Sequence, residues 1–284
     1  MDKGGTMKLL EGARAIVTGG GASVGRACVE VFIAHGARVA FLEIDPERAR
    51  EVEAATGAKG YVVDIADRVA VEAAISEAAA WLGGVTVLVN QASCCFLNVV
   101  HQQTDAEFER TLDVNIKGHF YCTRAVIPHM LAAGKGSIVD ISSVAATNPG
   151  WAESTYCAAK AAQIVLSKEV AIDYAPVIRA NSLAVGWIHD SPTSSGIQQV
   201  PELIDPVFDE HPSGRGGQSW EIANVALFFA SDMSSYVTGQ CLIVDGGQTL
   251  PQPGLNGTMR RIVAQMRDEP LTRKVRGTPP PRPW

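Results

Sequence analysis

Short apolar segments and longer helix-like segments alternate along most of this chain. The apolar segments predict strands at residues 13–18, 38–43, 61–63, 85–90, 137–141, 180–184 and 240–244. Helical patterns fall between them at 24–34, 68–82, 105–133, 155–174 and 219–231, and another begins at Pro46, where the missing N–H of proline costs nothing. Such alternation is typical of a parallel sheet with helices on both faces, joined by right-handed crossovers. We therefore predict an α/β fold with a doubly wound Rossmann-type sheet, in a single domain of residues 1–250.

The last 34 residues, 251–284, differ from the rest in charge and form a C-terminal extension. They carry seven basic and two acidic residues, which gives +5 against −11 for the rest of the chain. The apolar side chains Met259, Ile262, Val263 and Met266 have the spacing of one helix face. Asn256 is a candidate cap for this helix, Pro270 bounds it, and residues 278–284 are proline-rich. The extension is either a surface appendage or an arm that packs on an acidic neighbouring subunit.

Composition excludes several classes of function. The chain has no run of about 18 apolar residues, so we expect no membrane-spanning segment. Its first ten residues lack the apolar core of a signal peptide, and we expect a cytoplasmic protein. A net charge of −6 argues against nucleic-acid binding. The six cysteines show no metal-ligand spacing, so no metal site is expected, and the adjacent Cys94 and Cys95 are free thiols or a vicinal disulfide.

A glycine-rich segment, Thr18 to Gly25, lies between the first predicted strand and the first predicted helix. Glycines there allow a tight turn and a close approach of the backbone to a pyrophosphate, which the helix N-terminus also attracts. Glu43 follows 18 residues after Gly25, at the end of the second strand, where an acid holds a ribose 2′-hydroxyl. Since its carboxylate would repel a 2′-phosphate, we predict NAD as the cofactor. The alternative is that Glu43 is a solvated charge at a strand end.

Tyr156 and Lys160 are four residues apart in a predicted helix, so they share one of its faces. An ammonium beside a phenol lowers the pKa of the tyrosine, and such a phenol can exchange a proton with an alcohol or carbonyl oxygen. Ser143, at the end of the preceding strand, is placed to donate a hydrogen bond to the same oxygen. Alone, this pair has the simpler explanation of two residues that share a helix face by chance.

Together these segments resemble the short-chain dehydrogenase/reductase (SDR) family, from roughly residue 9 to residue 249. The matching segments are 18–25, Asp64-Ile65, 90–93, 113–118, 141–143, the Tyr156 to Lys160 motif, 181–188 and 236–247. The resemblance implies a catalytic tetrad of Asn115, Ser143, Tyr156 and Lys160. Tyr156 would be the acid/base and Ser143 would orient the substrate oxygen. Lys160 would lower the pKa of the tyrosine and hold the nicotinamide ribose, and Asn115 would support a proton-relay water.

The resemblance also assigns the cofactor site. The expected cofactor-binding residues are Gly19, Gly21, Ser23, Val24, Gly25, Glu43, Ile44, Asp64, Ile65, Asn90, Ala92, Tyr156, Lys160, Gly186 and Ile188. Three segments depart from the family pattern. Ser23 replaces the second loop glycine, so its hydroxyl either weakens pyrophosphate binding or binds a phosphate oxygen. Gln91 and Ser93 replace an asparagine and a glycine of the family. Val185 replaces a proline, and Asp190 replaces a threonine that contacts the nicotinamide carboxamide.

Three loops are expected to choose the substrate, namely residues 93–97, 145–152 and 187–217. Their apolar side chains predict a mostly apolar pocket, formed by Phe96, Leu97, Trp151, Trp187, Val200, Ile204, Val207 and Phe208. Two interpretations are open for His189, Asp190 and His211: they bind a polar group of the substrate, or they are exposed loop residues.

These observations predict an NAD(H)-dependent oxidoreductase that interconverts a secondary alcohol and a ketone. The alternative is an NAD(H)-binding regulatory or scaffolding protein of the same fold with little turnover. An epimerase or dehydratase would need an added substrate domain, for which 34 residues are too few. The resemblance implies a homotetramer with the helix of Tyr156 and residues 240–247 at its interfaces. That helix also has apolar residues on other faces, Ala159, Val165, Leu166, Val170 and Ala171, which a partner subunit can cover.

Overall fold

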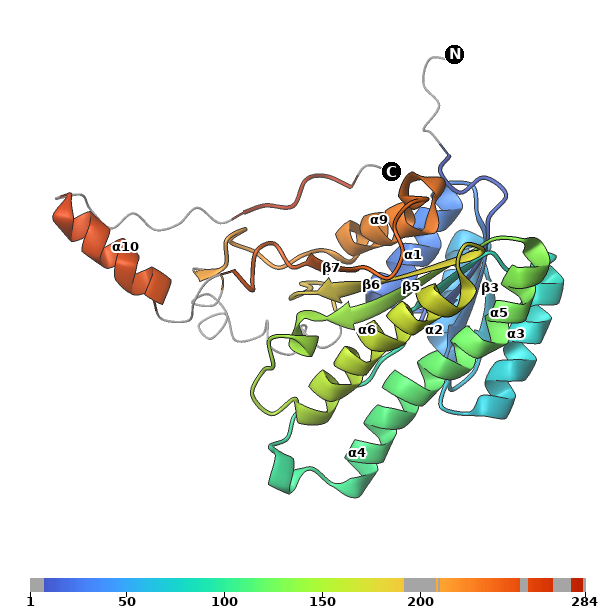
Figure 1. Ribbon diagram of the computed structural model, residues 1–284, viewed down its shortest axis with the longest axis horizontal. Helices are drawn as coiled ribbons and strands as arrows, with labels where there is room; N and C mark the ends of the chain where they lie inside the picture. Colours follow the sequence, from blue (N-terminus) through green and yellow to red (C-terminus); the bar gives the residue numbers. More distant parts are fainter. Residues whose placement is uncertain (1–7, 192–207, 209, 251–254, 268–276, 283–284) are drawn as a thin grey trace, which may run out of the picture.

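The computed structural model describes residues 8–191, 208, 210–250, 255–267 and 277–282. Its centre is a parallel sheet of seven strands in the order β3-β2-β1-β4-β5-β6-β7 (Figure 1). The strands are β1 (Arg14–Thr18), β2 (Arg38–Glu43), β3 (Lys59–Val62), β4 (Val87–Asn90), β5 (Gly136–Ser143), β6 (Ile178–Val185) and β7 (Cys241–Val244). The order reverses between β1 and β4, as in a doubly wound sheet, so the predicted fold class is confirmed. All seven predicted strands exist, with ends within two residues of those predicted.

Helices cover both faces of the sheet and bury two separate hydrophobic cores. One core lies under α1 (Ser23–Ala34), α2 (Pro46–Thr56) and α9 (Ser219–Ala230). The other lies under α3 (Arg68–Leu82), α5 (His119–Ala133) and α6 (Ser154–Tyr174). Within β1 the side chains alternate, because Val17 belongs to the first core and Ile16 to the second. Burial on both faces explains why the strands are nearly continuous apolar segments in the sequence.

The predicted helix at residues 105–133 is interrupted at a functional position. It consists of α4 (Asp105–Leu112), a π-helical segment η2 (Asp113–Gly118) and α5. The π turn contains Asn115, whose side chain is fully buried. Widened turns of this kind occur frequently at functional sites, because they redirect side chains and backbone carbonyls away from the regular helix. The pattern of apolar residues predicted helix throughout and did not reveal this widened turn.

The C-terminal extension forms the predicted helix, α10 (Leu255–Met266), which lies away from the sheet in Figure 1. Its four apolar residues of one face are 40 to 81% exposed. Further along, Arg282 forms an ion pair with Glu30 of α1 in the same chain. No helix in the described ranges is long and apolar enough to cross a membrane.

Candidate functional site

A cavity of about 660 Å³ opens along the carboxyl ends of the strands, on both sides of the point where the strand order reverses. Ligands of doubly wound sheets bind at this place. The predicted residues that line it are Gly19, Ser23, Val24, Glu43, Ile44, Asp64, Ile65, Ala92, Ser143, Tyr156, Lys160, Gly186 and Ile188. Gly21, Gly25, Asn90 and Asn115 do not line the cavity but lie behind its wall. The structure therefore brings most of the predicted site together.

The glycine-rich loop closes one end of the cavity. Its backbone is tied to β2, because the N–H groups of Gly19 and Gly20 donate to the carbonyl of Leu42 at 2.7 and 3.2 Å. A Cβ on Gly25 would overlap the carbonyl oxygen of Gly19, so only glycine allows α1 to begin this close to the loop. The N-terminus of α1 then faces the cavity, as expected for an anion site.

Ser23 and Asp190, two departures from the family pattern, meet through a third residue. Ser23 has a left-handed backbone with φ of 48°, which costs a non-glycine residue on the order of 1 kcal/mol. Its hydroxyl lies 3.1 Å from that of Ser219, the first residue of α9. Asp190 Oδ1 accepts hydrogen bonds at 2.9 Å from the N–H and the hydroxyl of Ser219. Both departures thus take part in one contact between the glycine loop and the segment after β6.

Glu43 is held at the cavity wall by backbone donors. The residue is only 6% exposed, so the alternative of a solvated strand-end charge is wrong. Oε2 accepts from the N–H of Gly21 at 2.8 Å, and Oε1 accepts from the N–H groups of Ile44 and Asp45 at 3.0 and 3.1 Å. A Cβ on Gly21 would lie 2.5 Å from Oε2, which makes glycine necessary there. Arg48 also lines the cavity and pairs with Asp45 at 3.5 Å.

Asp64 has a partner that the sequence did not reveal. Arg110, from α4, binds it through two hydrogen bonds of 2.7 and 3.2 Å, and both side chains line the cavity. The carboxylate also accepts from the N–H of Ala66 at 3.0 Å. Despite partial burial, these donors hold the pKa of Asp64 below its usual value. The 46 residues between the two partners explain why spacing alone did not suggest the pair.

Tyr156 and Ser143 meet at the opposite end of the cavity. The phenol and the Ser143 hydroxyl both line this end of the wall, and Ser143 Oγ accepts from the N–H of Ala145 at 3.1 Å. Burial raises the pKa of Tyr156 above its usual value, although the nearby Ser143 hydroxyl opposes this effect. The expectation of a lowered pKa at Tyr156 is therefore wrong for this geometry. The Tyr156 phenol and the Ser143 hydroxyl can together bind the carbonyl oxygen of a substrate.

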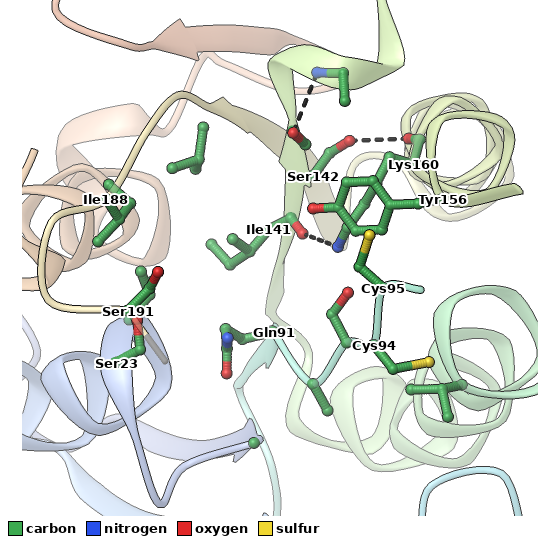
Figure 2. A pocket seen from close by; sticks show the side chains of 18 of the residues that line it. Ser23, Gln91, Cys94, Cys95, Ile141, Ser142, Tyr156, Lys160, Ile188 and Ser191 are labelled. Atoms are coloured by element: carbon green, nitrogen blue, oxygen red, sulfur yellow. Dashed lines mark hydrogen bonds between the residues drawn. The ribbon is translucent and has the colours of Figure 1, made fainter. Parts of the chain in front are cut away.

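The position of Lys160 explains this result. Its ammonium lies 5.6 Å from the centre of the Tyr156 ring and donates to the carbonyl of Ile141 at 2.9 Å, below the ring (Figure 2). The two residues share a helix face as predicted, but burial outweighs the effect of the charge on the phenol. Burial also lowers the pKa of Lys160 to about 8, although the nearby Asp140 raises it. Lys160 therefore titrates close to neutral pH.

Asn115 is fixed behind the cavity by both ends of its side chain. Its amide oxygen accepts from the N–H of Cys94 at 2.9 Å and from the Ser93 hydroxyl at 3.1 Å, while its amide nitrogen donates to the carbonyl of Cys94 at 2.8 Å. Its backbone carbonyl accepts a 2.6 Å hydrogen bond from Gln163 of α6. That contact was not predicted, and it uses the peptide group that the π turn exposes.

Further polar groups are buried behind Lys160. Asn90 donates to Asp140 at 2.8 Å and to Thr123 at 3.0 Å, and it therefore supports the site rather than lining it. Burial raises the pKa of Asp140 to about 6. The imidazole of His119 lies 2.8 Å from the carbonyl of Ala92, and burial lowers its pKa to about 3, which keeps the ring neutral.

The predicted apolar substrate pocket is only partly present. Trp187 lines the cavity and packs edge-on against Phe208 at 6.5 Å, but Trp151 is 85% exposed and does not line it. Val200, Ile204 and Val207 lie outside the described residues. His189 and Asp190 are exposed, whereas His211 is buried beside Ser213 at 2.9 Å. The described wall near Tyr156 is instead more polar than predicted, with Ser143, Asn148, Cys95 and Glu153.

The adjacent cysteines are free thiols. Cys94 donates a 3.6 Å hydrogen bond to the carbonyl of Arg110, and Cys95 points towards the ring of Tyr156 (Figure 2). Burial raises the pKa of Cys95 to about 11, so it is a neutral part of the wall at physiological pH.

Comparison with known proteins agrees with this geometry. A family model described as enoyl-(acyl carrier protein) reductase matches residues 19–249. Galactitol 2-dehydrogenase (L-tagatose-forming) of Cereibacter sphaeroides is 37% identical over 253 residues, which cover 86% of this chain and 98% of that protein. The 2-(R)-hydroxypropyl-CoM dehydrogenase of Xanthobacter autotrophicus is 36% identical, with 83% and 98% coverage.

A solved structure gives the same result. The aldohexose dehydrogenase of Thermoplasma acidophilum superposes with a TM-score of 0.79 at 32% identity and covers 87% of this chain and 98% of its own. The relatives are named as dehydrogenases of alcohols and sugars, a reaction class that uses a nicotinamide cofactor. The chain therefore belongs to the short-chain dehydrogenase/reductase family and is an oxidoreductase that acts on CH–OH groups.

Proposed function

We propose that this protein interconverts a secondary alcohol and a ketone with NAD(H), using Tyr156 as the acid/base. The observation that carries the proposal is that Tyr156 and Ser143 line the same end of the cavity, with the buried ammonium of Lys160 5.6 Å from the centre of the Tyr156 ring. Relatives named for galactitol and for an aldohexose support a carbinol carbon as the reacting centre.

Ser143, Tyr156 and Lys160 have different roles at the substrate oxygen. The Ser143 hydroxyl holds the substrate oxygen, and the Tyr156 phenol gives it a proton in ketone reduction or takes one in alcohol oxidation. At the adjacent carbon, the hydride would be exchanged with a nicotinamide held in the cavity. Lys160 holds its positive charge on the other side of the ring, where it favours the phenolate as soon as the phenol loses its proton. Lys160 is buried, and Ser143 and Tyr156 are half-buried, which limits the access of water to the transfer.

The cavity wall fits a dinucleotide. The glycine loop and the N-terminus of α1 offer backbone donors to a pyrophosphate, and Asp64 and Arg110 form a wall beyond Glu43. Glu43 supports NAD over NADP, because its two oxygens are fixed by three backbone donors and a 2′-phosphate would meet a buried negative charge. Arg48 is the cation nearest in sequence that lines this end, but Asp45 pairs with it.

We also propose a homotetramer. Several apolar side chains stand on the outside of the described subunit, on α5, α6 and β7, and they are 41 to 72% exposed: Phe120, Val165, Ile172, Leu242 and Ile243. Phe120 borders a small apolar groove between α5 and α6, together with Ala162 and Leu166. Patches of this kind mark surfaces that another protein covers.

A panel of ketones and secondary alcohols, followed by NADH absorbance, tests the enzymatic proposal. We expect steady, enzyme-dependent oxidation of NADH with at least one ketone, and the reverse with the matching alcohol. Binding of NADH without turnover of any member of a broad panel would contradict the proposal and favour a cofactor-binding protein of the same fold.

A further inference from the structure

The cavity wall beside Tyr156 contains a carboxylate that the proposed reaction does not use. Glu153 precedes α6 and lines the cavity near Ser143, Asn148 and Cys95. The side chain is half-buried, and burial alone raises its pKa. No side-chain or backbone donor of the described residues reaches this carboxylate. A half-buried carboxylate in the cavity wall, without a donor among the described residues, can accept a hydrogen bond from a ligand.

The backbone before Glu153 is shaped to put this carboxylate in the wall. Ala152 has a left-handed conformation with φ of 67°, which a residue with a Cβ adopts only at a cost. The carbonyl of Ala152 accepts a 2.8 Å hydrogen bond from the N–H of Asn98, which holds this conformation. A Cβ on Gly150 would overlap the Glu153 carboxylate, so glycine at this position leaves the space that the carboxylate occupies.

Glu153 is also close to the reacting atoms. It stands at the start of α6, three residues before Tyr156, and both side chains line the same cavity. A substrate whose oxygen lies between Tyr156 and Ser143 would therefore bring the substituents of its carbinol carbon near the Glu153 carboxylate.

The charges along the cavity decide which substituent fits. The described cationic residues of the wall are Arg48 and Arg110 at the Glu43 end and Lys160, which donates to Ile141. The substrate end therefore offers an acceptor and no free cation among the described residues, so an anionic substrate is disfavoured. An ammonium group on the substrate would lie close to Lys160 and to the positive ring of an oxidised nicotinamide, and both would repel it. A neutral hydroxyl can donate to the carboxylate without this repulsion.

We propose that Glu153 selects neutral polyhydroxylated substrates by accepting a hydrogen bond from the hydroxyl on the carbon next to the reacting carbinol. This inference rests on the proposed function and assigns its substrate class. Glu153 is thus a specificity-determining residue, distinct from the four residues expected to act on the reacting oxygen and the cofactor.

Four alcohols that share a reacting carbinol test the inference. They are butan-2-ol, butane-2,3-diol, 3-aminobutan-2-ol and 3-hydroxybutyrate, which differ in bearing no further polar group, a hydroxyl, an ammonium or a carboxylate. The measured quantity is kcat/KM for each alcohol relative to butan-2-ol, in the wild type, Glu153→Gln and Glu153→Ala. Glu51→Gln is the matched control, because Glu51 is an exposed carboxylate of α2 outside the cavity wall.

We expect the wild type to prefer the diol to butan-2-ol by at least about tenfold, and Glu153→Ala to reduce this preference by roughly ten- to a hundredfold. Glu153→Gln keeps an acceptor oxygen and should lose less, while 3-hydroxybutyrate should gain relative to butan-2-ol. The Glu51→Gln control should keep the wild-type preferences. An unchanged preference in both Glu153 variants overturns the inference, and so does a wild-type preference for the amino alcohol over the diol.

A binding measurement separates this inference from the proposed function. Calorimetric titration of erythritol into the NADH-saturated protein reports recognition of a polyol without turnover. If the wild type turns over no member of the broad ketone and alcohol panel, the proposed function fails, but weaker erythritol binding in Glu153→Gln, at an unchanged melting temperature, still supports the inference. Equal binding by the wild type and Glu153→Gln overturns it.

Discussion

Replacement of Lys160 by methionine is expected to make the protein more stable while it destroys the activity. Lys160 is only 2% exposed, and burial lowers its pKa from 10.5 to about 8. This difference corresponds to about 3 kcal/mol that disfavours the charged form in the folded state at neutral pH. The variant also loses the hydrogen bond to the carbonyl of Ile141, worth about 1 kcal/mol. We therefore expect a net gain of about 1–2 kcal/mol.

The stability difference between Lys160→Met and the wild type should depend on pH. Below pH 8 both folded and unfolded chains carry the charge, so the full cost of the buried ammonium is present. Between about pH 8 and 10.5 the folded protein releases the proton while the unfolded chain keeps it. Because the unfolded state then binds more protons, the free energy of unfolding of the wild type rises relative to that of the variant.

Urea unfolding at several pH values measures both effects. The stability difference between Lys160→Met and the wild type should shrink as the pH rises from 8 towards 10.5. Lys168→Met, which removes an exposed lysine from the same helix, is the control and should show no such trend. A Lys160→Met variant that is less stable at pH 7, with a difference that does not change with pH, would refute the reasoning.

Three further changes test other parts of the account. Glu43→Ala should narrow a wild-type kcat/KM preference for NAD over NADP of about tenfold or more, roughly 1.4 kcal/mol; equal use of both cofactors by the wild type contradicts the role of Glu43. Ser23→Gly removes a side chain from the wall at the expected pyrophosphate site and should tighten NADH binding severalfold by calorimetry, whereas weaker binding would show that the hydroxyl holds a phosphate oxygen. By light scattering we expect the mass of a tetramer, and a smaller species for Ile172→Glu but not for Val69→Glu, a similarly exposed apolar position on α3; a monomeric wild type at micromolar concentration refutes the assembly.

Much of the fold and most of the cavity were predictable because their signals are local. The periodicity of apolar residues that predicts a strand or a helix can be recognised within a few residues. The motifs from Thr18 to Gly25 and from Tyr156 to Lys160 are equally local, because each lies within one turn or one helix. Strand order then brings distant motifs to one edge of the sheet, as with Glu43 and the glycine loop. The C-terminal helix was predicted from the spacing of its apolar residues alone, and α10 confirms it.

The features that sequence reasoning missed depend on partners far apart in the chain or on burial. The Asp64–Arg110 pair joins the segment after β3 to α4, and the contact of Ser23 with Ser219 spans 196 residues. The direction of the pKa of Tyr156 depends on how deeply the phenol is buried, which helix spacing does not show. Glu153 stands three residues before Tyr156, and its proximity to the tyrosine was the one local signal for its role.

The central claim, that Tyr156 transfers the proton, is tested most directly by Tyr156→Phe. This variant removes the hydroxyl and keeps the ring, so we expect kcat/KM to fall by about a hundredfold or more while the dissociation constant of NADH changes little. Tyr174→Phe, at the other end of the same helix, is the control and should retain activity. A Tyr156→Phe enzyme that keeps a tenth or more of the wild-type activity would contradict the account, because another group would then have to supply the proton.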